Sequence, residues 1–221
     1  LEEGYFKKSY VEQEKENLKR KIESRINDKR SYAIDRCIEE MCKNERFGIY
    51  PLGSIEDLPK IDEEILYKHY KKVIETSPIE IFFVGNYDDD MVLYMKEMAN
   101  IERGEIIDIP REQIISRVKT KNMVYEDLDV NQGKLVLGFR TGIPYEDRLY
   151  NGLLVGNDIL GGGPNSKLFK TVREKESLAY YITSTVFKYK SILLVDGGIE
   201  FENFEKTIDI IKEQIEEIQK G

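Results

Sequence analysis

Residues 157–199 limit the possible folds of this chain more than any other stretch. They read NDILGGGPNSKLFKTVREKESLAYYITSTVFKYKSILLVDGGI. The end of an apolar helix leads into a glycine loop at 161–164, and Asn165-Ser166 then predicts the capped start of another helix. Two apolar strands follow, joined by a charged turn at 188–190. This order predicts an antiparallel sheet with helices packed on one of its faces.

The glycine loop and the junction that follows it also carry candidate chemistry. Gly161, Gly162 and Gly163 permit backbone dihedrals that other residues avoid, and allow the backbone to lie close to another chain. Arg173 and Tyr180 lie where the helix ends and the strand begins. A guanidinium and a phenol can both donate hydrogen bonds to a carbonyl oxygen and stabilise negative charge that develops on it. From the residues alone, a solvated charged patch is the favoured interpretation of Arg173, and a strand aromatic half in the core is the favoured interpretation of Tyr180.

The rest of the second half completes an α+β pattern. Residues 123–130 and 134–143 predict two strands, and the first of these alternates as a strand with one wet face does. A helix is predicted from 144–147 to Leu160. The final segment has an apolar stripe with helical spacing, formed by Phe204, Ile208, Ile211, Ile215 and Ile218.

The first half is more strongly charged and mainly helical. Helices are predicted between residues 2 and 44 and from 62 to 76, whereas the continuous apolar run at 79–86 predicts a buried central strand. Asp88 to Asp90 then begin a helix, for which capping explains the acidic triplet better than a cation site does. A polar stretch ends this half. The predicted organisation is therefore a first lobe at 1–104, a linker at 105–120 and a second lobe at 121–221.

The run LGGGPNSKLFKTVREKESLAY resembles a signature in the second lobe of the insulinase/pitrilysin/mitochondrial processing peptidase family. These zinc metallopeptidases enclose a peptide between two-lobed halves, and the resemblance extends from about Tyr10 to Gly221. It implies two lobes, each a mainly antiparallel sheet with helices on one face, both incomplete in this chain. It also implies that Arg173 and Tyr180 face the catalytic chamber and hold substrate, and that the loop Gly161–Gly163 takes part in substrate handling.

The chain departs from the active members of that family at the zinc site. They bind zinc through His-x-x-Glu-His and a later glutamate, whereas this chain has one histidine, His69, and no such motif. The resemblance assigns Glu12 to the third ligand, with its two histidine partners upstream of Leu1. The chain by itself is thus expected to hold no zinc or other cofactor and to be inactive. His69 is predicted to lie beside the apolar stripe of its helix, without a catalytic role.

Charge and cysteine content exclude several other classes. A net charge of −8 and a pI of about 5.0 argue against a nucleic-acid binder with a basic footprint. No apolar run approaches the roughly 20 residues of a membrane span, and no signal peptide is visible. A cytoplasmic location is expected for the chain. Cys37 and Cys42 are predicted to be free thiols, because their spacing points them to different faces of a helix. The chain is expected to be a piece of a longer protein.

Two functions fit these observations. In the first, the chain binds and clamps a peptide for a peptidase of the family, or serves as an inactive partner half in a homo- or heterodimer. In the second, it is an interaction scaffold of the same fold that takes no part in proteolysis. Retention of Arg173, Tyr180 and the glycine loop favours the first.

Overall fold

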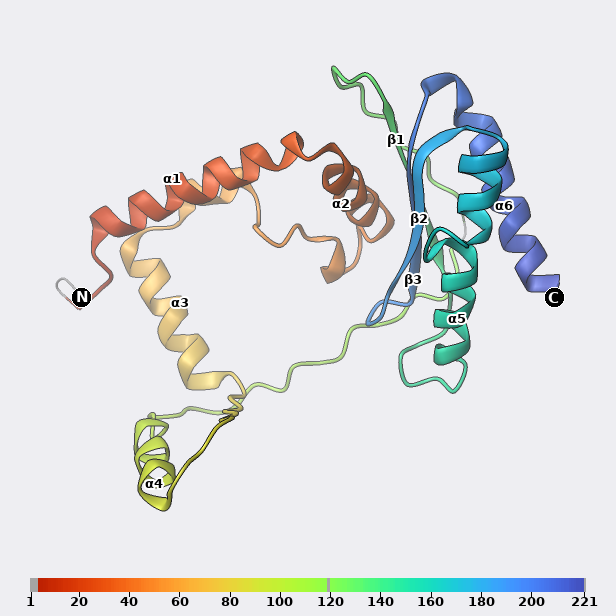
Figure 1. Cartoon of the computed structure of the whole chain (residues 1–221). Coiled ribbons are helices and arrows are strands. Elements are labelled where there is room, and N and C mark those ends of the chain that lie inside the picture. The colour runs from red at the N-terminus through yellow and green to blue at the C-terminus, as the bar shows by residue number, and fades with distance from the viewer. Residues whose placement is uncertain (1–3, 119, 221) are drawn as a thin grey trace. The chain divides into compact units, whose positions relative to one another are not determined.

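The computed structural model describes residues 4–118 and 120–220 as helices, three strands and irregular segments (Figure 1). The chain divides into two compact units. The first unit contains the chain up to Ile22 and Ser54–Arg111, and the second contains Glu23–Gly53 and the chain from Glu112 onward. The main elements are α1 Lys8–Ser24, α2 Lys29–Met41, α3 Glu63–Thr76, α4 Asp89–Met98, β1 Gly133–Arg140, α5 Tyr150–Gly161, β2 Ala179–Phe187, β3 Ile192–Ile199 and α6 Phe204–Lys220.

The second unit is built on an antiparallel sheet of order β1-β3-β2, and this confirms the α+β class. β3 is the central strand and is buried along its whole length. Its alternate side chains enter two different hydrophobic clusters, because successive residues of a strand point to opposite faces. Leu193 and Val195 join one cluster, whereas Ile192 and Leu194 join the other.

Helices cover both faces of this sheet, so the prediction that helices pack on one face was wrong. α5, α6 and the π-helical segment Phe169–Lys175 cover one face, and α2 packs against the other (Figure 1). The physical reason is the two-sided apolar character of β3, which requires cover on each face. α2 approaches closely where β1 has Gly138, since a Cβ atom there would lie 2.6 Å from the Met41 sulfur.

A buried charge cluster fixes the second face near the end of α2. We define it as Glu45, Glu112, Arg140 and Lys190. The Lys190 ammonium lies 2.6 Å from the Glu45 carboxylate and 2.7 Å from that of Glu112, and only 1% of its side chain is exposed. Arg140 pairs with Glu45 and donates to the Met41 carbonyl at 2.9 Å. The cluster therefore joins α2, β1, the β2–β3 turn and the segment at residue 112.

A second ion pair holds the start of α2 to the same face of the sheet. Asp28 caps α2 by accepting hydrogen bonds from the amides of Arg30 and Ser31. The Arg30 guanidinium donates two hydrogen bonds, at 2.6 and 3.2 Å, to Asp196 in the middle of β3. The Asp196 side chain is 5% exposed, and its ion pair with Arg30 offsets the free-energy cost of burying the carboxylate.

Two other predicted elements of the second half differ from the structure. Residues 123–130 form no strand, because Glu126 is held by ion pairing to Arg36 at 2.6 Å and by the Tyr32 hydroxyl at 2.8 Å. α5 begins at Tyr150, later than predicted, since residues 144–149 form hydrogen-bonded turns instead of the first helical turn. The β2–β3 hairpin and α6 are confirmed.

The first unit contains α3, α4, most of α1 and long irregular segments. Asp62 and Asp88 cap α3 and α4 through their side chains, as predicted for the acidic helix starts. The predicted strand at 79–86 does not form: the run is irregular, and Phe82 and Val84 are 82% and 96% exposed. The reason is that the described residues of this unit include no strand with which it could pair.

Candidate functional site

The glycine loop stands at the end of α5, against β2. Thr183 donates a hydrogen bond from its hydroxyl to the Gly161 carbonyl at 3.0 Å, and the Ser184 hydroxyl donates to the Asn157 carbonyl at 3.1 Å. A Cβ atom on Gly161 would lie 2.6 Å from the Ser184 backbone nitrogen. Absence of a side chain on Gly161 therefore permits close packing against β2 of the same chain, whereas the predicted approach to another chain stays a prediction.

The other part of the glycine prediction was wrong. None of Gly161, Gly162 and Gly163 has a positive φ, so the loop uses no dihedrals reserved for glycine. A Cβ atom on Gly162 would lie 2.6 Å from Asp158, whereas one on Gly163 would meet no atom within 4 Å. Gly162 and Gly163 line an open depression of about 560 Å³ together with Val155, Asp158, Ile159 and residues 164–166.

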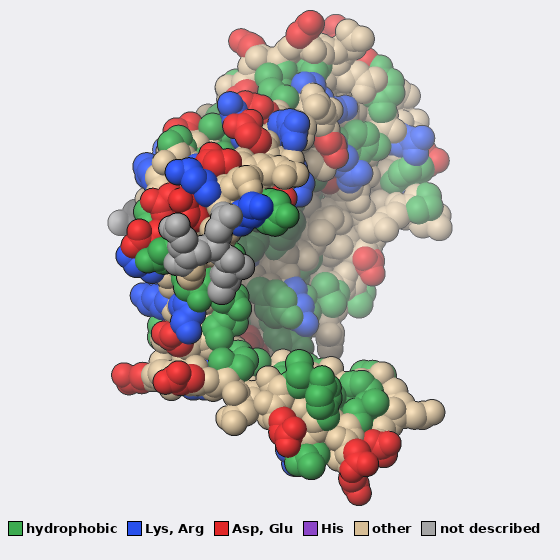
Figure 2. Space-filling view, turned by 90° about the vertical axis from the view of Figure 1, so that its left-hand side faces the viewer, with side chains coloured by type: hydrophobic (Ala, Val, Ile, Leu, Met, Phe, Trp, Pro, Cys, Tyr) green, Lys and Arg blue, Asp and Glu red, His purple; other side chains and the backbone are tan. Residues whose placement is uncertain are grey.

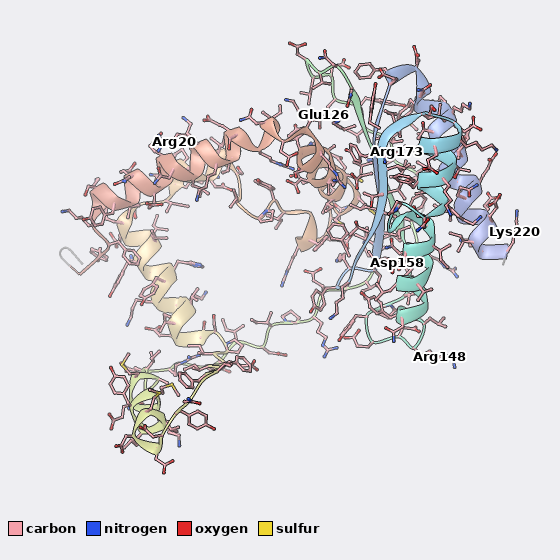
Figure 3. The ribbon with its side chains drawn as sticks, viewed as in Figure 1. Arg20, Glu126, Arg148, Asp158, Arg173 and Lys220 are labelled. Atoms are coloured by element: carbon pink, nitrogen blue, oxygen red, sulfur yellow. The ribbon has the colours of Figure 1, made fainter. Side chains whose placement is uncertain are left out.

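Arg173 lies in the π-helical segment that follows the loop (Figure 3). Ser166 begins this helix, as predicted, and accepts a hydrogen bond from the Phe169 amide at 3.4 Å. The Arg173 side chain is exposed, and its guanidinium lies 4.6 Å from the centre of the Phe169 ring. A π-helical turn widens the backbone spiral and occurs often at functional sites.

Tyr180 occupies a β-bulge at the start of β2. Ala179 pairs with Ile199 and Tyr181 pairs with Gly198, which leaves Tyr180 as an extra residue in the strand. Bulges redirect a side chain and are common beside active sites. The Tyr180 side chain is 51% exposed. Its hydroxyl donates to Glu200, and this hydrogen bond raises the pKa of Tyr180.

The turn between these residues brings the helix end and the strand start together through the backbone. The Leu178 amide donates to the Val172 carbonyl at 2.9 Å, and Ser177 has a φ of 52°. Arg173 and Tyr180 thus flank one tight junction, although each side chain is engaged by a different neighbour. The sequence spacing predicted the junction, but it gave no sign of the π-helical turn or of the bulge.

The predicted zinc ligand stands alone. Glu12 lies on α1, its side chain is 52% exposed, and it accepts a hydrogen bond from Lys15 at 2.9 Å. Among the residues that the structure describes, no group of three or more His, Cys, Asp or Glu side chains could hold a metal ion. The residues that the structure describes therefore do not form a zinc site by themselves. His69 is exposed on α3, beside a stripe that is itself exposed.

The two cysteines are free thiols, as predicted, with Cys42 buried and Cys37 half-buried. Burial raises the pKa of Cys37 to about 11, so this thiol is a poor nucleophile at neutral pH. Across the described ranges 4–118 and 120–220, no helix is both long enough and apolar enough to cross a membrane.

Comparisons with known proteins agree on one family. A family model described as "Peptidase M16 inactive domain" matches residues 60–221. The chain is 38% identical, over its whole length, to a protein of Bacillus subtilis named "Probable inactive metalloprotease YmfF", of which it covers 52%. The chain thus spans about half the length of this curated relative.

Two solved structures have a similar fold. A conserved protein from Enterococcus faecalis is 29% identical, with a TM-score of 0.79 over 98% of this chain and 51% of that one. A peptidase M16 inactive domain from Pseudomonas fluorescens is 19% identical, with a TM-score of 0.74 over 97% of this chain and 52% of that one. At that lower identity the likeness shows the fold alone.

Proposed function

This chain belongs to the peptidase M16 family, as an inactive domain of it, and on that premise we propose that it binds and clamps a peptide substrate without cleaving it. It would do so as part of a family peptidase or as the inactive half of a homo- or heterodimer. The resemblance found in the sequence is confirmed at the level of the family. The peptide, the partner half and the two-lobed organisation at 1–104, 105–120 and 121–221 belong to this proposal.

The observation that carries the proposal is the backbone around Arg173 and Tyr180. Both side chains are exposed, and each stands at an irregularity, one in a π-helical turn and the other in a β-bulge. A guanidinium that leaves the Phe169 ring and a phenol that exchanges Glu200 for a substrate could both donate to a peptide carbonyl. The glycine loop lies before them in sequence and lines an open depression.

In a family peptidase, zinc supplies the water nucleophile. Because the residues described here do not form a zinc site, neither Arg173 nor Tyr180 is given that role. Their part is to orient the peptide and to stabilise the negative charge on its carbonyl oxygen. Glu12 would be a zinc ligand only if the parent protein supplies two histidines from outside this chain.

A scaffold role is the second candidate, and one observation favours it. Tyr180 already donates to Glu200, and Arg173 already stacks on Phe169, so neither group requires a substrate to be satisfied. A scaffold would keep these contacts permanently. The two functions therefore differ in whether the contacts open when a peptide is present.

The test is peptide hydrolysis by the full-length parent, measured alone and mixed with a candidate partner half, together with its zinc content. Arg173→Ala is expected to lower kcat/KM about a hundredfold, the usual effect of losing one donor to a developing oxyanion. Arg148→Ala, at an exposed arginine in the turn before α5, is the matched control and should leave hydrolysis unchanged (Figure 3).

Circular dichroism and melting temperature must show that both variants fold. Equal hydrolysis by the parent and by the Arg173→Ala variant would remove Arg173 from the mechanism. If no assembly hydrolyses peptide, the scaffold role takes first place.

A further inference from the structure

We propose that three tyrosines beside the β2–β3 turn form a binding site for an organic ammonium ion, with preference for a methylated one. We define the tyrosine cluster as Tyr145, Tyr150 and Tyr189. The centre of the Tyr145 ring lies 5.4 Å from that of Tyr150 and 6.0 Å from that of Tyr189, with the ring planes inclined at 81° and 64°. The cluster stands at the end of β2, whereas Tyr180 stands at its start, so this site is separate from that of the proposed function.

A cation already occupies the tyrosine cluster, and it belongs to the chain itself. The Lys188 ammonium lies 3.7 Å from the centre of the Tyr145 ring and 5.1 Å from that of the Tyr189 ring. Both distances are within the roughly 6 Å over which the face of an aromatic ring attracts a cation. Aromatic side chains that surround a positive charge in this way recognise quaternary ammonium ligands. The position of the Lys188 ammonium therefore indicates where a ligand would bind.

The backbone holds the tyrosine cluster in place. Tyr189 lies in the β2–β3 turn, and Ser191, which ends this turn, is fully buried with a φ of 52°. The Ser191 hydroxyl donates to the Ile143 carbonyl at 2.7 Å, and the Ser191 carbonyl accepts from the Thr141 amide at 2.9 Å. These bonds tie the turn to the segment that carries Tyr145. Rings positioned in advance lower the entropic cost of binding a ligand.

Lys188 can be displaced by a ligand that fits the rings better. A primary ammonium is a strongly hydrated point charge, and the neighbouring Lys190 ammonium shows the partners that suit it, the carboxylates of Glu45 at 2.6 Å and Glu112 at 2.7 Å. In the tyrosine cluster Lys188 meets ring faces, which replace lost water poorly. Its flexible four-carbon stem lets the ammonium move into solvent. A methylated ammonium is less strongly hydrated and brings apolar methyl groups to the rings, so the cluster suits it better.

The charge of the protein also favours a cationic ligand. The chain has 42 acidic and 34 basic residues, which give a net charge of −8. Figure 2 shows one face of the molecule, on which Asp and Glu side chains lie among the Lys and Arg side chains. The net field attracts a cation and repels an anion. The rings then select an organic ammonium over Ca²⁺ or Mg²⁺, because these metal ions require oxygen ligands.

The test is a titration of the full-length parent with tetramethylammonium, followed by saturation-transfer NMR of the methyl protons of the ligand. tert-Butanol is the matched control ligand, because it has a similar shape and no charge. Tetramethylammonium is expected to bind at least about tenfold more tightly than tert-butanol. A second arm uses a tripeptide with trimethyllysine at its centre. Tighter binding of this tripeptide than of tetramethylammonium would assign the site to side chains of a polypeptide, whereas equal or weaker binding would assign it to a free ammonium ion.

Substitutions with matched controls locate the site. Tyr145→Leu is expected to weaken the binding of tetramethylammonium at least about fivefold, whereas Tyr94→Leu, at a tyrosine of α4 that is 62% exposed, should leave it unchanged. If Tyr145→Leu prevents folding, Tyr189→Leu takes its place, because that ring is 72% exposed, and should weaken binding at least about threefold. Lys188→Ala removes the competing ammonium and should tighten binding about threefold, the worth of an exposed cation–π contact. Lys206→Ala should leave binding unchanged.

Any of three results would overturn the proposal. Equal or undetectable binding of tetramethylammonium and tert-butanol would show that the protein does not recognise the charge. Unchanged affinity in the Tyr145→Leu and Tyr189→Leu variants would place the ligand outside the tyrosine cluster. Unchanged or weaker binding by the Lys188→Ala variant would show that the Lys188 ammonium does not compete for the site. None of these outcomes depends on Arg173 or on peptide cleavage, so failure here is distinct from failure of the proposed function.

Discussion

Replacing Lys190 with methionine is expected to destabilise the second unit by about 3 kcal/mol. The Lys190 side chain is 1% exposed, and its ammonium donates to the Glu112 carboxylate at 2.7 Å and to the Gln113 carbonyl at 2.9 Å, and pairs with Glu45 at 2.6 Å. Removing one partner from a buried pair typically costs about 3–5 kcal/mol. The lower end of this range applies because Glu45 still has its ion pair with Arg140 and because the Glu112 side chain is partly exposed.

A double-mutant cycle separates this effect from lost packing. Lys190→Met leaves the buried charge cluster with one excess negative charge, and Glu45→Gln leaves it with one excess positive charge. The double variant is neutral, so its destabilisation should fall short of the sum of the single effects by about 1 kcal/mol or more. Lys206→Met is the control: this ammonium lies 2.7 Å from Glu176 with its side chain 58% exposed, and its loss should cost less than about 1 kcal/mol.

The assay is urea unfolding at neutral pH, followed by fluorescence and by circular dichroism so that two-state behaviour can be checked. Strict additivity of the Lys190 and Glu45 substitutions would refute the coupling that the distances imply. A Lys190→Met variant no less stable than the Lys206→Met variant would refute the claim that burial makes this cluster important.

The same cluster predicts the pH range over which the second unit is most stable. Burial opposes the charge of Glu45, but hydrogen bonds from Arg140 and Lys190 more than offset it, so the pKa of Glu45 lies below 4.5. Burial likewise opposes the charge of Lys190, but Glu112 and Glu45 raise its pKa above 10.5. A lowered carboxyl pKa contributes stability that is lost as pH falls through it, and a raised amine pKa contributes stability that is lost as pH rises through it. Stability should therefore decline below about pH 4.5 and above about pH 10.5, and the acid decline should be smaller in the Glu45→Gln variant.

Two further predictions concern close packing and buried charge, and both are checked by the same unfolding assay. Gly161→Ala should lower the free energy of unfolding by about 2 kcal/mol, because its new methyl group would meet the Ser184 backbone. Gly163→Ala adds a methyl group in open space and should change that free energy by no more than about 0.5 kcal/mol. Equal effects of the two substitutions would contradict the packing argument. Arg30→Ala should lower the free energy of unfolding more than Asp196→Asn does. The first substitution leaves the Asp196 carboxylate, with its side chain 5% exposed, without this ion pair, whereas the second leaves an arginine side chain that is 49% exposed. The reverse order would contradict the argument from buried charge.

Local pattern predicted the elements whose partners lie nearby in sequence. The β2–β3 hairpin is closed by its own turn, the stripe of α6 has a regular helical period, and Asp62 and Asp88 cap the helices that follow them. In each case the deciding interactions lie within the element or between neighbours. The family signature added the location of the candidate site, which composition and periodicity alone did not give.

Predictions failed where the deciding partner lies far away in the chain. Arg36 and Tyr32 hold Glu126 from about ninety residues earlier, so the alternating pattern around it did not become a strand. α2 covers the second sheet face with the help of two ion pairs, Arg30 with Asp196 and Glu45 with Lys190. The partners in each pair are still farther apart in the sequence. The continuous run at 79–86 had the composition of a strand, but the described residues of its unit include no strand that could pair with it.

The geometry of the candidate site also could not be predicted from the sequence, and it bears on the choice between the two functions. Between Phe169 and Tyr180 the chain passes through a π-helical turn, a Ser177 with a φ of 52° and a β-bulge. Each departure is less favourable than regular structure, and such departures are expected where a site must aim particular side chains. A scaffold that only packs against neighbours gains nothing from three of them around Arg173 and Tyr180. The concentration of irregular backbone at this junction therefore favours peptide binding over a purely structural role.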